Sequence, residues 1–120
     1  MLDTLAAEWA DRKTRFNHEG EALLAAYAGG VLVGVGGITL EPVVPGALRI
    51  RRFYVRAPFR RSGIGKRLAT RLLEPAIRGS LVVTANAAAG SEAFWERLGF
   101  APDRHDGHTH ILRPRATYPF

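Results

Sequence analysis

The run Arg60-Arg61-Ser62-Gly63-Ile64-Gly65 has the residue types with which a chain binds an anion through backbone N–H groups. It follows a predicted strand that ends at Val55 and leads into a predicted helix that begins near Gly63. The first N–H groups of a helix have no partner within the helix, so they converge on a place suited to an anion. A glycine there keeps any Cβ from holding a phosphate away from the backbone. The spacing predicts an anion-binding turn, with a glycine turn that binds nothing as the alternative.

Two well-known phosphate loops are excluded by spacing. A Walker loop needs glycine five residues before Gly65, where Arg60 stands, and Ser or Thr after Lys66, where Arg67 stands. A dinucleotide fingerprint needs a further glycine at Leu68. The turn therefore belongs to neither class.

The net charge of +6 is concentrated around this turn. From Val43 to Leu73 the chain has nine basic residues and no acidic one, which leaves eight basic against eleven acidic residues elsewhere. Such a segment is typical of a surface that binds a polyanion, and a solvated basic strand and helix is the alternative.

Length and composition limit the remaining choices. A chain of 120 residues, 47% apolar and 23% charged, fits one globular domain. It has no cysteine, which excludes disulfides, thiolate metal sites and a cysteine nucleophile. No apolar run is long enough to cross a bilayer, and the first residues do not resemble a signal peptide, so we expect a cytoplasmic protein without a membrane partner.

The N-terminal half is predicted to contain one helix and three strands. Apolar residues recur at near-helical spacing over residues 1–16, which indicates a helix there. The apolar runs 21–28 and 31–40 flank Gly29-Gly30, a link suited to a tight hairpin. Residues 47–55 alternate as a third strand, and a slip in the alternation near Arg51-Arg52 suggests a bulge.

The C-terminal half is predicted to alternate helices and strands. A helix follows Gly63, with an apolar stripe and with Pro75 expected to kink or end it. A strand at 81–85, a helix at 91–98 closed by Gly99, a strand at 109–112 and a loose tail at 113–120 complete the chain. This order predicts an α/β (α+β) fold with a mixed sheet, and a helix between two strands predicts one parallel pair.

Two motifs resemble those of the GNAT superfamily of N-acetyltransferases. Phe53-Tyr54-Val55 followed by Arg60-x-x-Gly63-x-Gly65 and Leu68 is similar to the family's acetyl-CoA motif. Asn86 followed by residues 94–100, Phe-Trp-Glu-Arg-Leu-Gly-Phe, is similar to its second motif. The resemblance implies a mixed, mostly antiparallel sheet with helices on both faces, with residues 47–79 as the cofactor-binding strand, turn and helix. It also implies that the domain is shortened at its N-terminus and lacks a first strand and helix, which a partner in a homodimer would be able to supply.

The resemblance also implies roles for individual residues. The backbone of residues 53–55 would pair with the pantetheine arm of acetyl-CoA, and the N–H groups of the turn would hold its pyrophosphate. Basic side chains would add charge, and residues of the second motif would flank the cofactor. The implied cofactor-binding residues are Phe53, Tyr54, Val55, Arg60, Arg61, Ser62, Gly63, Ile64, Gly65, Lys66, Asn86, Phe94 and Trp95.

The implied reaction is direct attack of an acceptor amine on the thioester of acetyl-CoA in a ternary complex, with no metal. The chain departs from the family where proton transfer is concerned, because Trp95 stands where a tyrosine is frequent and Arg49 where a glutamate is frequent. An indole N–H is not a general acid. The catalytic acid and base stay unassigned, with Glu41, Tyr54 and Glu92 as candidates that have structural roles as their alternative. The acceptor, a small molecule or a peptide, cannot be named, although Arg51 or Arg52 in the site would favour one that carries an acid.

Three alternatives are open. His108 and His110 share a strand face and would be able to start a metal site, but with only His105 and Asp106 nearby we expect surface histidines and no metal. A GNAT-like domain that binds coenzyme A without catalysis is a second reading. A basic nucleic-acid-binding module is a third, against which stand the lack of a stacking platform and of helix-turn-helix spacing.

Overall fold

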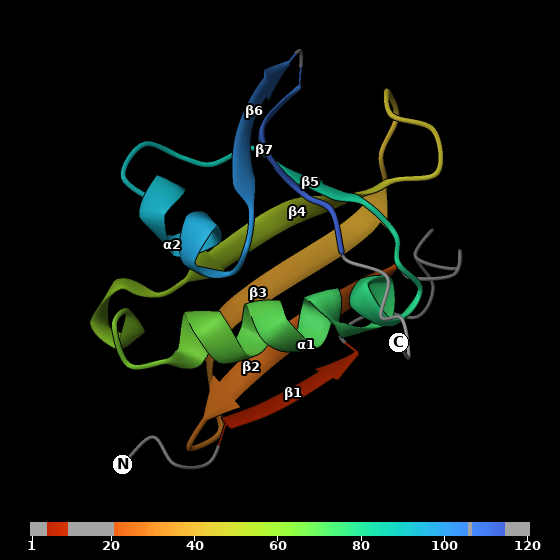
Figure 1. Cartoon of the computed structure of the whole chain (residues 1–120). Helices are drawn as coiled ribbons and strands as arrows, with labels where there is room; N and C mark the ends of the chain where they lie inside the picture. The colour runs from red at the N-terminus through yellow and green to blue at the C-terminus, as the bar shows by residue number, and fades with distance from the viewer. Residues whose placement is uncertain (1–4, 10–20, 106, 115–120) are drawn as a thin grey trace, which may run out of the picture.

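The fold is a single twisted sheet with helices packed on it (Figure 1). The computed structural model describes residues 5–9, 21–105 and 107–114. Within these residues, seven strands lie in the order β1-β2-β3-β4-β5-β7-β6, and β4 with β5 is the parallel pair among otherwise antiparallel neighbours. The strands are β1 Leu5–Trp9, β2 Ala22–Ala28, β3 Val31–Leu40, β4 Leu48–Val55, β5 Val83–Ala85, β6 Ala101–His105 and β7 His108–Leu112. The helices are the short 3-10 turn η1 Ala57–Phe59, α1 Ile64–Arg78 and α2 Glu92–Arg97. The expected mixed, mostly antiparallel sheet and its one parallel pair are confirmed.

The hairpin between β2 and β3 forms where the sequence predicts it. Gly29 and Gly30 have φ angles of 59° and 80°, the left-handed pair that a two-residue hairpin turn requires. The bulge in β4 is also confirmed: the register with β3 shifts between Val35 and Gly37, and Arg52 there has a φ of 53°. A bulge opens the hydrogen-bond ladder locally, so it changes which backbone groups of β4 are free.

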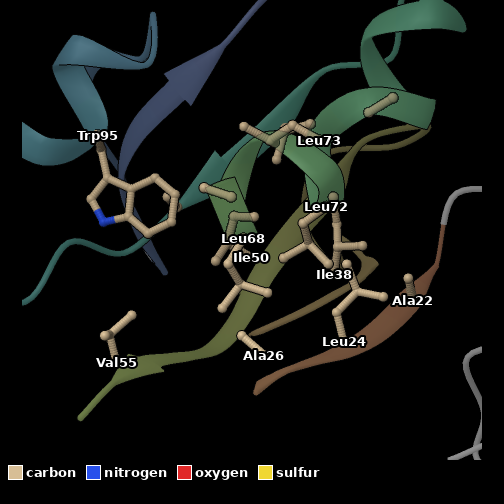
Figure 2. Packing of buried hydrophobic residues seen from close by; sticks show 14 of the residues in the cluster. Ala22, Leu24, Ala26, Ile38, Ile50, Val55, Leu68, Leu72, Leu73 and Trp95 are labelled. Atoms are coloured by element: carbon tan, nitrogen blue, oxygen red, sulfur yellow. The ribbon is translucent and has the colours of Figure 1, made fainter. Parts of the chain in front are cut away.

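The core lies between α1 and the middle strands of the sheet (Figure 2). Apolar side chains at helical spacing on α1 are almost fully buried, which is the pattern of a helix with one face on a sheet. Gly36 of β3 allows this close packing, because a Cβ there would lie 2.8 Å from Cδ2 of Phe53 and 3.2 Å from Cδ2 of Leu72. The buried helix residues are Ile64, Leu68, Ala69, Leu72, Leu73 and Ala76.

The prediction for Pro75 is wrong about the end of α1, which continues to Arg78. A proline costs a helix one hydrogen bond, but here only one turn follows it. Ala76 in that turn is buried in the core, and the Gly79 N–H closes the helix on the carbonyl of Pro75 at 3.0 Å. Tertiary packing therefore holds the last turn in place.

The N-terminal helix predicted over residues 1–16 is wrong for residues 5–9, which form strand β1 paired antiparallel with β2. Leu5, Ala7 and Trp9 also satisfy a period of two, so the apolar pattern fits both structures, and pairing with the edge of β2 decides between them. A strand that we expected the chain to lack is therefore present. The rest of the predicted helix lies outside the described residues.

The region after α2 contains two strands, whereas the sequence predicted one. β6 was missed because its residues, Ala-Pro-Asp-Arg-His, are polar and mostly exposed. Proline and charges are typical of an edge strand, which is the place of β6 in the sheet. Beyond β7, Arg113 and Pro114 are in neither helix nor strand, and the rest of the predicted tail lies outside the described residues.

Candidate functional site

The glycine turn, residues 60–65, joins the end of β4 to the start of α1. The Arg60 Nε donates a hydrogen bond to the carbonyl of Val55 at 2.8 Å, and the Arg60 guanidinium lies 5.2 Å from the ring centroid of Tyr54. The Ser62 hydroxyl donates to the carbonyl of Phe59. These contacts fix the turn against the end of the strand, so Arg60 has a structural role in shaping it.

The backbone N–H groups from Arg61 to Lys66 are unpaired, whereas that of Arg60 donates to the carbonyl of Ala57 at 3.2 Å. Arg67 is the first residue whose N–H bonds back into the turn, to the carbonyl of Gly63 at 3.0 Å. Across the described ranges, no backbone carbonyl accepts from the N–H groups of residues 61–66. No acidic residue stands in the first turn of α1, and both Arg61 and Lys66 are exposed. The start of α1 therefore offers several free donors and positive charge to an anion.

The turn requires glycine at positions 63 and 65 for different structural reasons. Gly63 has a φ of 86° and nothing within 4 Å of where its Cβ would be, so it faces open space in a conformation that favours glycine. Gly65 has a Cβ position 3.3 Å from Cε1 of Phe94 and 3.6 Å from Cγ2 of Val55. Of the two, only Gly63 leaves its surface open to a ligand, while Gly65 permits α1 to approach α2.

A gap opens in the sheet next to the glycine turn. Strands β4 and β5 pair only at Leu48 with Val83 and at Arg49 with Thr84, and they separate beyond those residues (Figure 1). Residues 50–55 of β4 therefore have a neighbour strand on one side only, among the residues described. The bulge at Arg52 lies within this stretch, with the predicted cofactor strand Phe53–Val55 after it.

The aromatic residues of the second motif pack together beside this gap. The ring centroids of Phe53, Phe94, Trp95 and Phe100 are 4.9 to 5.7 Å apart in contacting pairs. Trp95 is 5% exposed and belongs to the core, whereas Phe94 is half-buried between α1 and α2. The exposed Asn86 follows the end of β5. The structure thus places residues of both motifs around the gap, with Trp95 inside the core.

A family model for the GNAT acetyltransferase domain matches residues 4–111. The chain belongs to this family. No curated protein matches the sequence at a significant level.

Solved structures with the same fold include several bacterial acetyltransferases. A candidate acetyltransferase of Exiguobacterium sp. 255-15 aligns at a TM-score of 0.74 and 25% identity, over 82% of this chain and 66% of that one. A GNAT-family acetyltransferase of Staphylococcus aureus Mu50 aligns at 0.68 and 13% identity, over 81% of this chain and 70% of that one. The N-acetyltransferase YlbP of Bacillus subtilis, solved with coenzyme A, aligns at 0.63 and 17% identity, over 77% of this chain and 67% of that one. This GNAT domain spans about two-thirds of the length of each.

The three candidates for proton transfer occupy different environments in this GNAT domain. Glu41 is buried, and its carboxylate accepts from the Thr84 hydroxyl at 2.6 Å and from the Val43 N–H at 2.7 Å. Burial alone would raise the pKa of Glu41, but these hydrogen bonds and the charge of Arg49 outweigh it and lower the pKa. A carboxylate held in this way is a weak base. Tyr54 is exposed beneath Arg60, and Glu92 is half-buried in the first turn of α2.

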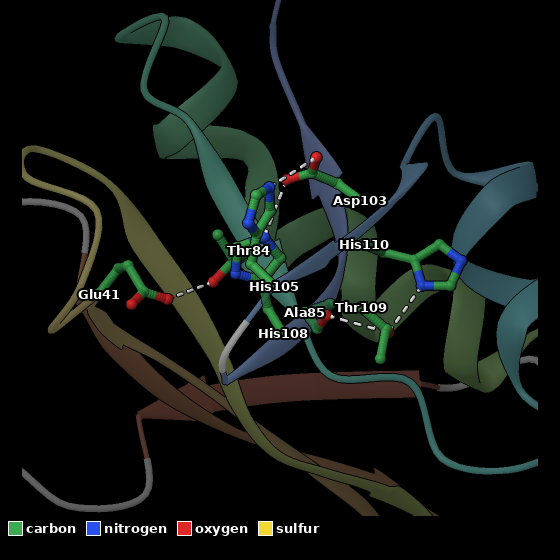
Figure 3. A network of polar contacts seen from close by, with 8 residues as sticks. All are labelled: Glu41, Thr84, Ala85, Asp103, His105, His108, Thr109 and His110. Atoms are coloured by element: carbon green, nitrogen blue, oxygen red, sulfur yellow. Dashed lines mark hydrogen bonds and ion pairs between the residues drawn. The ribbon is translucent and has the colours of Figure 1, made fainter.

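The prediction of surface histidines is wrong for His108 and His110, which are 4% and 1% exposed. The His108 Nε2 lies 3.0 Å from Asp103 Oδ2 (Figure 3). The His110 Nε2 lies 2.9 Å from Glu96 Oε2. The hydrogen bond with His108 is the main reason that the pKa of Asp103 is lowered. Sequence reasoning missed both pairs because the carboxylates come from β6, which was not predicted, and from α2.

The described residues contain neither a metal site nor a helix that could span a membrane. No three side chains of the types that bind metals gather there as a metal site. None of the helices in the described part of the chain is long and apolar enough to cross a bilayer.

Proposed function

We propose that the protein is an N-acetyltransferase that transfers the acetyl group of acetyl-CoA to an amine. The observation that carries this proposal is the glycine turn at the start of α1. Free N–H groups, an open surface at Gly63 and the exposed basic side chains of Arg61 and Lys66 lie together there. Coenzyme A carries a pyrophosphate and a ribose phosphate, which matches a site of this kind. The B. subtilis relative with the same fold was solved with coenzyme A.

In this proposal the gap between β4 and β5 holds the pantetheine arm. The backbone of Phe53–Val55 pairs with the arm as a further strand would, since β5 has already separated from β4 there. Arg61 and Lys66 add charge near the phosphates, and Phe94 and Asn86 flank the arm. The acetyl group then lies near the bulge at Arg52, toward the closed end of the gap.

The chemical step is attack of the amine nitrogen on the thioester carbonyl carbon. The C–N bond forms and the C–S bond breaks. The sulfur leaves as the thiolate of coenzyme A, and the amine nitrogen gives its proton to solvent water. A backbone N–H beside the bulge stabilises the developing oxyanion. A thiol with a pKa of about 8.5 leaves readily as thiolate, so the buried Trp95 need not donate a proton. Since the chain has no cysteine, no acyl-cysteine intermediate forms, and both substrates bind together.

A second candidate function is binding of coenzyme A without catalysis. It is favoured by two residues at positions that the resemblance associates with proton transfer, because neither can act as the expected acid or base. Trp95 is packed in the core, and Arg49 stands in place of a glutamate. Binding without turnover on any amine would identify this function.

The test is calorimetric titration of acetyl-CoA into the protein and into Gly63→Glu. We expect the variant to lose at least about 100-fold in affinity, because a carboxylate would stand against the pyrophosphate, and like charges in contact cost several kcal/mol. Thr70→Glu, which adds the same charge at an exposed position of α1, is the matched control and should bind nearly as the unaltered protein does. Release of free thiol with a panel of amines then measures turnover. No binding of acetyl-CoA by the unaltered protein would refute the proposal, and salt-sensitive retention of DNA would favour the nucleic-acid alternative.

A further inference from the structure

Three buried side-chain atoms of the described residues have no hydrogen-bond partner: Thr39 Oγ1, Arg49 Nε and His108 Nδ1. Buried polar atoms are nearly always paired in folded proteins, so each exception calls for an explanation. An atom of this kind is satisfied when a ligand supplies the missing group.

Two of these atoms lie side by side on the sheet. Thr39 of β3 is directly opposite Arg49 of β4, and Arg49 is directly opposite Thr84 of β5. Residues directly opposite one another point to the same face of a sheet. We call Thr39, Arg49 and Thr84 the Arg49 row. The neighbouring residues Ile38 and Ile50 belong to the core under α1, so the Arg49 row points to the other face.

Arg49 also approaches the turn between β6 and β7. The Arg49 Nη1 is 3.7 Å from the position that a Cβ on Gly107 would occupy, and Gly107 precedes His108 in the chain. The guanidinium therefore reaches from β4 to the turn that carries His108. Asp103 holds the Nε2 of this histidine, which leaves Nδ1 as the unpaired ring atom.

Glu41, the carboxylate whose pKa the charge of Arg49 helps to lower, does not pair with the Arg49 guanidinium. Glu41 accepts hydrogen bonds from Thr84 and Val43, and no ion pair within 4.0 Å joins it to Arg49 in the part of the chain that the structure describes. Arg49 therefore keeps an unused donor and a guanidinium fork whose geometry matches a carboxylate. Thr39 adds a hydroxyl that can donate to the same group.

The Arg49 row also lies where an acceptor has to bind if the proposed function is correct. Arg49 and Thr84 are the last pair before β4 and β5 separate, so they form the closed end of the gap. The bulge at Arg52 is three residues farther along β4, which is roughly 10 Å of strand. The pantetheine arm would fill the gap beyond the bulge, and this leaves the closed end for the second substrate.

Resting on the proposed function, we infer that Arg49, with Thr39 beside it, binds a carboxylate on the acceptor, so that the substrate is a small amine that also carries a carboxylate, as an α-amino acid does. Arg49 is then the residue that determines acceptor specificity. It differs from Arg51 and Arg52, whose side chains are exposed, in having a buried donor without a partner.

The experiment compares amino acids with their methyl esters as acceptors, at saturating acetyl-CoA. The ester has the more easily deprotonated amine, so intrinsic reactivity favours the ester, and a preference for the acid reports on binding. We expect kcat/KM to favour acids, and Arg49→Gln to lower kcat/KM for acids by roughly 10- to 100-fold, as expected for a lost hydrogen bond to a charged group. The same variant should lower kcat/KM for esters much less than for acids. Arg49→Lys should restore part of the preference.

Arg78→Gln is the matched control, because it removes one exposed arginine at the far end of α1. Equal effects of Arg49→Gln on acids and esters, or loss of the preference in Arg51→Gln instead, would overturn the inference. If acetyl-CoA binds but no amine is acetylated, calorimetric binding of N-acetyl amino acids against their methyl esters decides the question without turnover. Binding of the acids that depends on Arg49 would support the carboxylate site even if the proposed transfer fails, and equal binding of both would refute it.

Discussion

The glycine turn and the Arg49 row both offer donors to an anion, but they are made from different parts of the chain. The turn uses backbone N–H groups of consecutive residues, and its surface at Gly63 is open. The row uses side chains from three strands, and its Thr84 is fully buried. The comparison suggests that the exposed side chains of the turn, such as that of Arg61, can be altered with little effect on folding, whereas the row couples ligand binding to the stability of the sheet.

Thr84→Val in the Arg49 row should lower the stability of the fold more than a substitution in the glycine turn does. The variant keeps the shape of the side chain, but it removes a hydrogen-bond donor to the buried Glu41. We expect a loss of about 1–3 kcal/mol in the free energy of unfolding, the usual cost of leaving a buried polar group unpaired. Thr70→Val, at an exposed position of α1, is the control and should change little. Chemical denaturation measures the free energy of unfolding of both variants. Equal losses would show that the Arg49 row contributes no more to stability than the exposed surface of α1 does.

The same variant has a pH signature. The hydrogen bond from Thr84 helps to lower the pKa of Glu41 from its ordinary 4.5, so the stability it contributes is present above that pH and is lost as the pH falls through the lower pKa of the folded state. Without Thr84 the pKa of the folded state rises. The difference in stability between the unaltered protein and Thr84→Val should therefore be largest near neutral pH and should narrow as the pH falls through the lowered pKa of Glu41. A difference that does not depend on pH would show that the hydrogen bond is not the cause.

Gly63→Ala tests how much the glycine turn contributes to stability and to acetyl-CoA binding. A residue with a side chain in the left-handed region costs roughly 1–2 kcal/mol, and this should be the whole effect on stability because the space around Gly63 is open. Gly46→Ala is a close match, with a φ of 78° and equally open surroundings. Both variants should lose similar stability, but only Gly63→Ala should also weaken acetyl-CoA binding in calorimetry. Weaker binding in both would point to a general loss of order rather than to the turn.

The contrast between the two regions also explains what the sequence could and could not predict. The glycine turn is local, so residue types at fixed spacing between a strand and a helix were enough to locate it. The hairpin at Gly29-Gly30 and the bulge at Arg52 were predicted for the same reason. The Arg49 row depends on the registers of β3, β4 and β5, and no short-range pattern in the sequence encodes those.

Tertiary pairing also overrode local pattern at both ends of the chain. Residues 5–9 pair with β2 although their apolar spacing suits a helix, and the polar β6 pairs with β7 although its composition suits a loop. The burial of His108 and His110 follows from the second of these pairings, which is why they were expected at the surface.

The smallest effect is expected at Arg61, the exposed arginine of the glycine turn. In the proposed function Arg61 acts as a nearby charge, while the backbone makes the hydrogen bonds, so Arg61→Gln should weaken acetyl-CoA binding by only about 2- to 5-fold, as for an exposed ion pair. The variant should also reduce the dependence of affinity on salt, because one screened charge is removed. Arg78→Gln changes the net charge equally at the other end of α1 and should leave the affinity nearly unchanged. A loss at Arg61 as large as that of Gly63→Glu would mean that the side chain, and not the backbone, holds the phosphates, and the turn would then resemble the Arg49 row in its chemistry.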